Sequence, residues 1–380
     1  MRTTLTRRDF LKTLTAGTAG VGLLPALAQA GGKEAFSFGL LGDLHFDKLQ
    51  HHDLDWLKQE KPNDVSQVQN YTTLTRERLP QLFSRLRERL ANRDRAAFVA
   101  QTGDLVEGLC GSEKLAVQQD TEALEFVRQA NLGVPFLLAK GNHDVTGPGA
   151  PAAFSSVFHP FLKEQTARLN GDCNLTRAMY QIQHEQALFC FLDAYDKDCL
   201  PWLEATLGRR TARHCFVLLH PPVVPYGARS TWHLFSHEKE KAQRERLLEL
   251  LGKHNAFVLS GHIHKFNTLV RTTAQGGRFL QFALSSVLTA AEPKPLHHLT
   301  GLGSYNEDQV QVEPDFSPGT EAQRRAVYKA EAPFVKHFEY ADLPGYATIR
   351  VEAGQVTARV YPGVGRRVWQ EVPLSKLLEG

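Results

Sequence analysis

The chain has 380 residues, of which 42% are hydrophobic, with 44 basic and 41 acidic side chains and a formal net charge of +3. Four of the basic residues and one of the acidic residues lie in the first 12 positions, so 40 of each remain in the rest of the chain. Beyond the first 12 positions, the chain therefore lacks the basic excess that is typical of nucleic-acid-binding proteins. We expect no stable nucleic-acid partner.

Residues 1–30 have the pattern of a twin-arginine signal peptide. Arg7 and Arg8 precede a mildly apolar stretch over residues 14–27, and Ala28-Gln29-Ala30 supplies an Ala-x-Ala cleavage site. A membrane anchor is the alternative, but glycine and threonine interrupt the stretch, which is shorter than the about 20 apolar residues that a span requires. We therefore expect export by the Tat translocase to a bacterial periplasm or beyond. The mature protein then begins near Gly31 and has no transmembrane span.

Short apolar runs alternate with polar segments in the rest of the chain. The runs cover residues 36–41, 96–100, 134–139, 215–219 and 256–259, and their length and their Gly or Pro borders predict buried strands. Each run is followed by side chains that are common metal ligands, in the segments Gly42-Asp43-Leu44-His45, Gly103-Asp104, Gly141-Asn142-His143-Asp144, His220 and Gly261-His262-Ile263-His264. Because ligands bind at the carboxyl ends of strands in α/β sheets, we expect the five segments to converge on one rim.

Helices and further strands are predicted between and after these segments. Apolar periodicity predicts helices over residues 76–95, 113–129 and 237–253, whereas residues 51–71 form a polar insertion. Strands are predicted at residues 179–183, 187–192, 268–271, 278–284, 346–351 and 355–361, with the first two and the last two each forming a hairpin. Residues 292–331 are polar, with several Gly, Pro and His residues, and predict a long loop or cover. This alternation indicates a two-layered β sandwich flanked by helices.

The ligand types point to two transition metal ions. Mixed imidazole, carboxylate and amide ligands suit Mn, Fe, Co or Zn better than calcium, which prefers oxygen ligands alone. A carboxylate shared by two cations holds them roughly 3.5–4 Å apart, close enough to clamp one phosphoryl group and to generate a hydroxide near neutral pH. The sequence leaves the choice among the four metals open.

In order and context, the five segments resemble the signature of the calcineurin-like metallophosphoesterase superfamily, over Asp43 to His264. The resemblance implies an α/β fold, a four-layer αββα sandwich with the metal site at the carboxyl ends of the strands. It also implies two divalent or mixed-valence metal ions, the first held by Asp43, His45 and His264, the second by Asn142, His220 and His262, with Asp104 bridging both. We expect the catalytic domain to cover residues 31–290, with residues 291–380 as a C-terminal extension whose polar loop and β-hairpin pack on the same domain.

The resemblance places His143 beside the substrate phosphate without binding metal. There it would donate a hydrogen bond to a phosphoryl oxygen or a proton to the leaving oxygen. Asp144, the next residue, is expected to orient or charge His143.

Departures from the family pattern narrow the choice of activity. Purple acid phosphatases typically have a tyrosine three residues beyond the aspartate of the second segment, where this chain has Glu107. This disfavours a purple ferric enzyme, and we expect Glu107 to support the site or the loop without binding metal. Phosphoprotein phosphatases commonly have an arginine soon after the second and third segments, and this chain has neither. A phosphodiester or a small phosphomonoester therefore suits the site better than a phosphoprotein.

The segment over residues 221–237 follows His220 and is the candidate substrate loop. Arg229 is expected to hold a phosphate, and Trp232 and His233 are further candidate substrate contacts, with an aromatic ring stacking on a base or sugar. Ordinary loop packing is the alternative for each of them. A nucleotide, a phospholipid headgroup and a glycerophosphodiester all remain open as substrates.

These observations predict a dinuclear metal-dependent phosphoesterase that uses a metal-activated hydroxide on a small phosphate ester, with a phosphodiester favoured over a phosphomonoester. The alternative is a metal-binding recognition protein of the same fold without turnover. The presence of both Asp104 and His143 favours the enzyme, because a non-catalytic relative would be expected to lose one of them. The neutral charge disfavours a nuclease.

Overall fold

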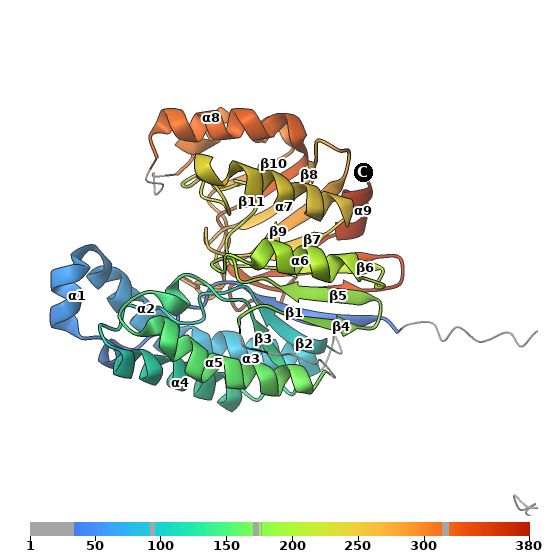
Figure 1. Ribbon diagram of the computed structural model, residues 1–380. Helices are drawn as coiled ribbons and strands as arrows, with labels where there is room; N and C mark the ends of the chain where they lie inside the picture. The colour runs from blue at the N-terminus through green and yellow to red at the C-terminus, as the bar shows by residue number, and fades with distance from the viewer. Residues whose placement is uncertain (1–33, 92–95, 170–174, 176, 314–318) are drawn as a thin grey trace, which may run out of the picture. The chain divides into compact units, whose positions relative to one another are not determined.

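Figure 1 shows the computed structural model, which describes residues 34–380 except 92–95, 170–174, 176 and 314–318. The predicted signal peptide lies outside the described residues. Among the residues described, no helix has both the length and the apolar character that crossing a membrane demands.

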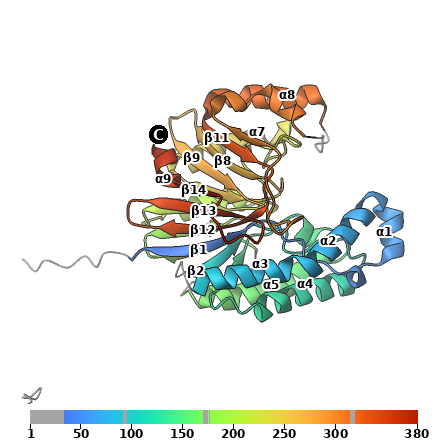
Figure 2. The ribbon, with the colours of Figure 1, turned by 180° about the vertical axis from the view of Figure 1, so that it is seen from behind.

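Six strands form the first sheet, in the order β14-β13-β12-β1-β2-β3. Their bounds are β1 Phe36–Leu41, β2 Ala96–Gln101, β3 Phe136–Leu138, β12 Gly345–Val351, β13 Val356–Pro362 and β14 Gln370–Val372. The strands β1, β2 and β3 are parallel, and β12 pairs antiparallel with β1. Figure 2 shows this C-terminal part of the sheet beside β1. The predicted hairpin over 346–361 is confirmed, because Val351 pairs with Val356 at its turn.

Eight strands form the second sheet, in the order β10-β11-β8-β9-β7-β6-β5-β4. Their bounds are β4 Tyr180–His184, β5 Ala187–Phe191, β6 His214–Leu218, β7 Phe257–Ser260, β8 Phe266–Thr272, β9 Arg278–Ala283, β10 His298–Thr300 and β11 Val335–Ala341. At its centre β5, β6, β7 and β9 run parallel. The strands after residue 290 thus belong to both sheets.

Phenylalanine side chains join the two sheets. The ring of Phe38 on β1 meets the rings of Phe189 and Phe216 on the second sheet edge to face, with centroids 5.2 and 5.5 Å apart. Phe98 on β2 also packs on Phe189, at 5.0 Å. All four side chains are fully buried. Each such aromatic pair contributes about 0.5–1.5 kcal/mol of stability beyond the contribution of its buried area. These ring contacts therefore hold the two sheets at a defined separation.

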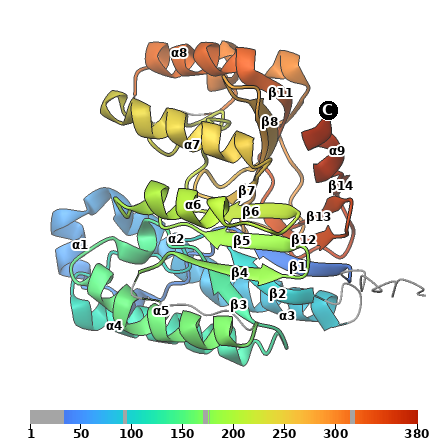
Figure 3. The ribbon, with the colours of Figure 1, turned by 45° about the vertical axis from the view of Figure 1, so that its right-hand side comes forward.

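Helices cover the outer faces of both sheets (Figures 1 and 3). The helices α3 Leu79–Arg89, α4 Glu113–Gln129 and α5 Ala150–Ala167 pack in one hydrophobic core with the first sheet. The helices α6 Cys199–Gly208 and α7 Lys241–Lys253 share a second core with β5, β6 and β7. A short helix, α9 Leu374–Glu379, ends the chain. The predicted four-layer αββα sandwich is confirmed.

Two polar stretches contain helices that their sequence did not predict. The insertion over 51–71 contains α1 Leu54–Glu60 and most of α2 Val65–Glu77. The prediction of a long loop over 292–331 is wrong at its end, where α8 Glu321–Glu331 forms behind a capping box of Thr320 and Gln323. The buried face of α8 carries Arg324, Tyr328 and Glu331. Two of these residues are charged, so the face has no apolar periodicity from which the helix could be predicted.

Glu331 at the end of α8 joins three elements. Its Oε1 accepts a hydrogen bond from Arg244 on α7 at 2.7 Å, and its Oε2 accepts one from Arg271 on β8 at 2.8 Å. Burial raises the pKa of Glu331, but the two arginines outweigh it and hold the pKa below its usual value. The carboxylate is therefore ionised at neutral pH and compensates two largely buried cations.

Replacing Glu331 by glutamine is expected to lower the free energy of unfolding by about 3 kcal/mol at pH 7, because both arginines lose their counter-charge. The difference from the parent protein should shrink as the pH falls through the lowered pKa of Glu331, since the carboxylate stabilises the fold only while it is ionised. Chemical denaturation over a series of pH values from neutral into acid measures this. The matched control is Glu321→Gln on the same helix, whose ion pair with Arg325 is exposed and contributes little. Equal effects of the two variants at pH 7 would contradict the account.

Candidate metal centre and adjoining cavity

The structure brings the seven predicted ligands together at the carboxyl ends of strands from both sheets. Asp43 and His45 follow β1, Asp104 follows β2, Asn142 follows β3, His220 follows β6, and His262 and His264 follow β7. Six of the seven, all but Asn142, fall into overlapping clusters of His and Asp side chains whose ligand atoms lie within 4.8 Å of one another.

The backbone at this rim is strained. His45, Asp104, His262 and His264 all have positive φ angles, of 48°, 56°, 72° and 59°. This left-handed region is unfavourable for residues with a Cβ and costs of order 1–3 kcal/mol at each position, so it persists only where the surroundings enforce it. The strain turns these side chains into the common space above the strand ends.

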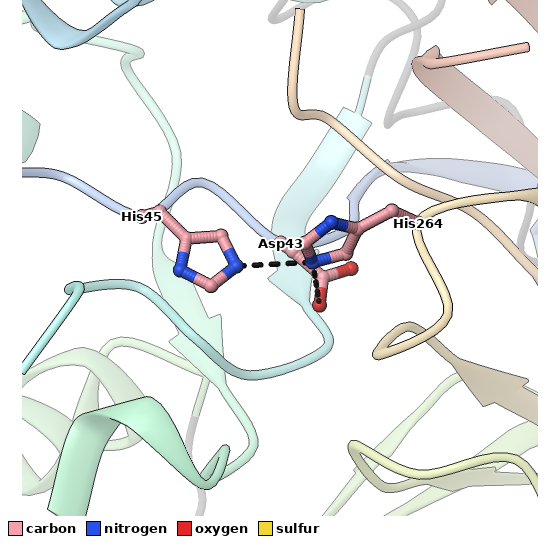
Figure 4. Close-up of side chains that lie close together, drawn as sticks. All are labelled: Asp43, His45 and His264. Carbon is pink, nitrogen blue, oxygen red and sulfur yellow. Dashed lines mark hydrogen bonds and ion pairs between the residues drawn. The ribbon is translucent and has the colours of Figure 1, made fainter. Parts of the chain in front are cut away.

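The first group consists of Asp43, His45 and His264 (Figure 4). The Nε2 atoms of the two histidines lie 3.0 Å apart, and Nε2 of His264 lies 3.4 Å from Oδ1 of Asp43. The side chain of Asp43 is fully buried. Burial raises its pKa, but His264 and His220 outweigh it and bring the pKa to about 2, so the carboxylate is ionised.

The second group gathers around Nε2 of His220. Oδ2 of Asp104 lies 2.9 Å from this atom, Oδ1 of Asn142 lies 3.1 Å from it, and Nδ1 of His262 also lies 3.1 Å from it. These nitrogen and oxygen atoms carry lone pairs, and the lone pairs face one another. A buried cluster of such atoms suits a bound cation.

Hydrogen bonds at the far side of the rings fix how the histidines face the cluster. Nδ1 of His45 donates to Oε2 of Glu107 at 2.7 Å, and Nδ1 of His220 donates to the carbonyl oxygen of Thr102 at 3.0 Å. Each bond leaves Nε2 unprotonated in the neutral ring and aimed at the cluster.

Asp104 lies between the two groups. Its Oδ1 accepts a hydrogen bond from the backbone amide of His143 at 2.8 Å. Its Oδ2 lies 2.9 Å from Nε2 of His220 and 3.8 Å from Nε2 of His45. One oxygen therefore orients the carboxylate, while the other is positioned between the two candidate sites.

The described residues fit a pair of metal ions. Oδ2 of Asp43 is buried without a hydrogen-bond partner, as expected of an atom reserved for a metal. The two aspartates are also packed against glycines. A Cβ at Gly261 would lie 2.5 Å from Oδ2 of Asp43, and one at Gly141 would lie 2.1 Å from Oδ1 of Asp104. Only glycine at these positions leaves room for the carboxylates.

His143 lies beside this cluster, but its predicted partner is a different residue. Nδ1 of His143 donates to the backbone carbonyl of Glu107 at 2.7 Å and lies 3.4 Å from the Glu107 carboxylate. Asp144 instead accepts hydrogen bonds from the backbone amides of Gly141, Asp104 and Val106. The expectation that Asp144 orients His143 is therefore corrected: its carboxylate holds two ligand loops together, and Glu107 contacts the ring.

A cavity of about 670 Å³ opens beside the cluster. The three predicted substrate contacts, Arg229, Trp232 and His233, all line it. His233 is buried and its Nδ1 donates to the carbonyl of Thr231 at 2.7 Å. Burial, reinforced by Arg244, lowers the pKa of His233 to about 3, so its ring is neutral. Trp232 is 47% exposed, and its ring meets that of His262 edge to face at 5.3 Å.

Two aromatic residues at the site were not predicted from the sequence. Tyr71 of α2 stacks on the ring of His45, with centroids 4.2 Å apart and planes 3° from parallel. Tyr195, which follows β5, lines the cavity. Neither belongs to a metal-ligand segment, and nothing in the local pattern of Tyr71 or Tyr195 separates it from an ordinary helix or loop tyrosine.

Comparison with family models matches residues 36–266 to the calcineurin-like phosphoesterase model. The chain belongs to the calcineurin-like phosphoesterase family. This match covers all seven candidate ligands together with His143. The family uses divalent metal ions for hydrolysis of phosphate esters, so the cluster is a candidate catalytic centre of a metal-dependent phosphoesterase.

Solved structures share the fold of this phosphoesterase. A structure of PhoD is 11% identical, with a TM-score of 0.52, covering 89% of this chain and 68% of that chain. The purple acid phosphatase PPD1 from yellow lupin seeds is 10% identical, with a TM-score of 0.53, covering 92% of this chain and 55% of that one. The chain thus spans about half the length of the lupin protein. Comparison with the curated proteins gave no match.

Replacing Glu107 by glutamine is expected to weaken manganese binding about 10- to 100-fold. Its carboxylate accepts hydrogen bonds from His45, a candidate ligand, and from Gln67, the latter at 2.8 Å. Loss of a hydrogen bond that orients a metal ligand typically weakens metal binding by this factor. Competition with a chelating dye measures the affinity. Glu125→Gln, an exposed change on α4, is the control and should leave the affinity unchanged. Equal affinities for the two variants would show that Glu107 does not support the site.

Proposed function

We propose that the protein is a dinuclear metal-dependent phosphoesterase that hydrolyses a small phosphodiester or phosphomonoester, with the diester favoured. The observation that carries this proposal is the position of Asp104, whose Oδ2 lies between His220 and His45 of the two candidate sites. Asp43, His45 and His264 would hold one ion, Asn142, His220 and His262 the other, and Asp104 both. Manganese, iron, zinc and cobalt all suit this donor set.

Two divalent cations held by these donors would supply positive charge for the phosphoryl oxygens and would lower the pKa of a water molecule. Around them, the residues of the chain bind and orient the substrate. Nδ1 of His143 is occupied by the carbonyl of Glu107, so Nε2 is the atom left to meet a substrate oxygen. Burial lowers the pKa of His143, but Glu107 and Asp104 outweigh it and the net shift is upward. With a proton on Nε2, His143 donates to a phosphoryl oxygen or to the leaving oxygen.

Features of the cavity support a small ester with an organic leaving group. The chain lacks the arginines that commonly follow the second and third segments in phosphoprotein phosphatases. Arg229 instead comes from the loop after His220 and lines the cavity. A guanidinium there can bind a phosphate oxygen, and the cavity volume leaves space for a group on the ester oxygen.

We also propose that the chain works in the bacterial periplasm or outside the cell after export by the Tat translocase. The support is the twin-arginine pattern at Arg7 and Arg8 and the Ala-x-Ala site before Gly31. Folding before export allows metal loading in the cytoplasm.

The esterase proposal is tested with bis(p-nitrophenyl) phosphate and p-nitrophenyl phosphate as substrates of the manganese-loaded mature protein. We expect faster turnover of the diester. His143→Ala should lower kcat by about 10²–10⁴-fold, because a proton donor is lost. Asp104→Ala should abolish turnover.

The control for this assay is His254→Ala, which removes an imidazole outside the metal centre and should leave kcat unchanged. Preference for the monoester would reassign the activity to a phosphomonoesterase. Failure to hydrolyse either ester with two ions bound would contradict the proposed activity and favour a recognition protein.

The export proposal predicts that changing both Arg7 and Arg8 to lysine keeps the protein in the cytoplasm. Cell fractionation followed by immunoblotting measures the exported share. Arg2→Lys lies outside the arginine pair and serves as the control. Unchanged export of the double variant would refute the assigned route.

A further inference from the structure

Two aromatic side chains are exposed at the cavity beside the metal centre. Tyr195 is 45% exposed and Trp232 is 47% exposed, and both line the cavity. Large aromatic surface left in water at the mouth of a cavity is unfavourable unless a ligand covers it, and such surface marks binding sites. The two residues come from different loops, after β5 and after β6.

Trp232 is held in place relative to a candidate metal ligand. Its ring packs edge to face on His262. The loop that carries it is closed by a hydrogen bond from the amide of Leu234 to the carbonyl of Pro222 at 2.8 Å. Tyr305, which follows β10 in the chain, donates to the carbonyl of Pro225 on this loop at 2.8 Å. Trp232 is therefore exposed on a loop that hydrogen bonds hold in place.

The same loop is braced from other elements as well. Tyr328 of α8 donates to the carbonyl of Gly227 at 2.7 Å, and Arg244 of α7 donates to the carbonyl of Val223 at 2.7 Å. Tyr328 lies beyond the part of the chain that the family model matches. Side chains from the C-terminal part of the chain thus contribute to the position of a loop that lines the cavity.

Tyr195 is linked to the third ligand segment. Its amide donates to Oδ1 of Asp193 at 3.0 Å, and Asp193, which is buried, forms an ion pair with Lys140. Lys140 directly precedes Gly141, the first residue of the third ligand segment, and its Nζ lies 5.9 Å from the centre of the Tyr195 ring. Both residues are therefore connected to ligand segments of the cluster.

We propose that the substrate is a phosphate ester whose leaving group carries a planar aromatic ring, specifically a nucleoside, and that Tyr195 and Trp232 contact its base. This rests on the proposed function and names its substrate class. Aromatic side chains bind bases through their faces or edges, and Arg229 lies on the same loop as Trp232 and lines the same cavity. The cavity of about 670 Å³ falls in the range of sites for small organic ligands and exceeds what a phosphate alone needs. The neutral charge favours a nucleotide over a polymer.

The reaction would be hydrolysis. The oxygen of water forms a new bond to phosphorus, the bond between phosphorus and the nucleoside oxygen breaks, and that oxygen takes up a proton. The products are a nucleoside and a phosphate, or a phosphate monoester when the substrate is a diester.

The test compares adenosine 5′-phosphate with ribose 5-phosphate, and the methyl diester of each, on the manganese-loaded protein. Each pair shares its leaving oxygen and differs only in the base. We expect a lower KM for the nucleotides. Trp232→Ala should raise their KM about tenfold, in line with base stacking, and change that of the ribose esters less than twofold. Trp232→Phe should restore most of the affinity. Tyr195→Ala should act in the same direction, whereas Tyr195→Phe should not.

Leu296→Ala is the matched control, because Leu296 is also an exposed apolar side chain but does not line the cavity. Calorimetric binding of adenosine and of ribose provides a readout without turnover. If the two bind alike and Trp232→Ala changes neither, the inference is overturned, whether or not nitrophenyl esters are hydrolysed. If adenosine binding depends on Trp232 but no ester is hydrolysed, the aromatic subsite is supported and the proposed activity fails.

Discussion

Imidazole nitrogen atoms and carboxylate oxygen atoms of the candidate metal centre are buried close together, with their lone pairs facing one another. Nε2 atoms of His45 and His264 lie 3.0 Å apart, and Oδ2 of Asp104 lies 2.9 Å from Nε2 of His220. Carboxylates and imidazoles removed from water need cations or protons between them, because their desolvation is otherwise costly. The positive φ angles at four of the ligands show that the backbone is bent to maintain this convergence.

Buried polar side chains keep the converging loops in register. Gln101 at the end of β2 donates to the carbonyl of Gly42 at 3.0 Å and accepts from the amide of Gly103 at 3.0 Å. Asp144 ties Gly141 to Asp104 through their amides. Loops that leave different strands are thereby joined before any ion binds. Hydrogen bonds hold the site together on the side of the candidate ligands, and the cavity opens beside it, as the proposed hydrolysis of a small ester requires.

The fold and the convergence of the candidate ligands could be predicted from the sequence because they depend on local pattern. Apolar runs ending in glycine mark strand ends, and strand ends of an α/β sheet share one rim. Features that depend on tertiary contact were not accessible. Helix α8 buries Tyr328 with Arg324 and Glu331, a face without apolar period. Adjacency in sequence suggested Asp144 as the partner of His143, whereas the fold brings Glu107 to the ring.

Anomalous diffraction from crystals of the manganese-loaded protein would show how many metal ions bind and where they lie. We expect two peaks roughly 3.5–4 Å apart, with Oδ2 of Asp104 between them, one near His45 and His264 and the other near His220 and His262. A single peak, or two peaks that do not share Asp104, would contradict this expectation.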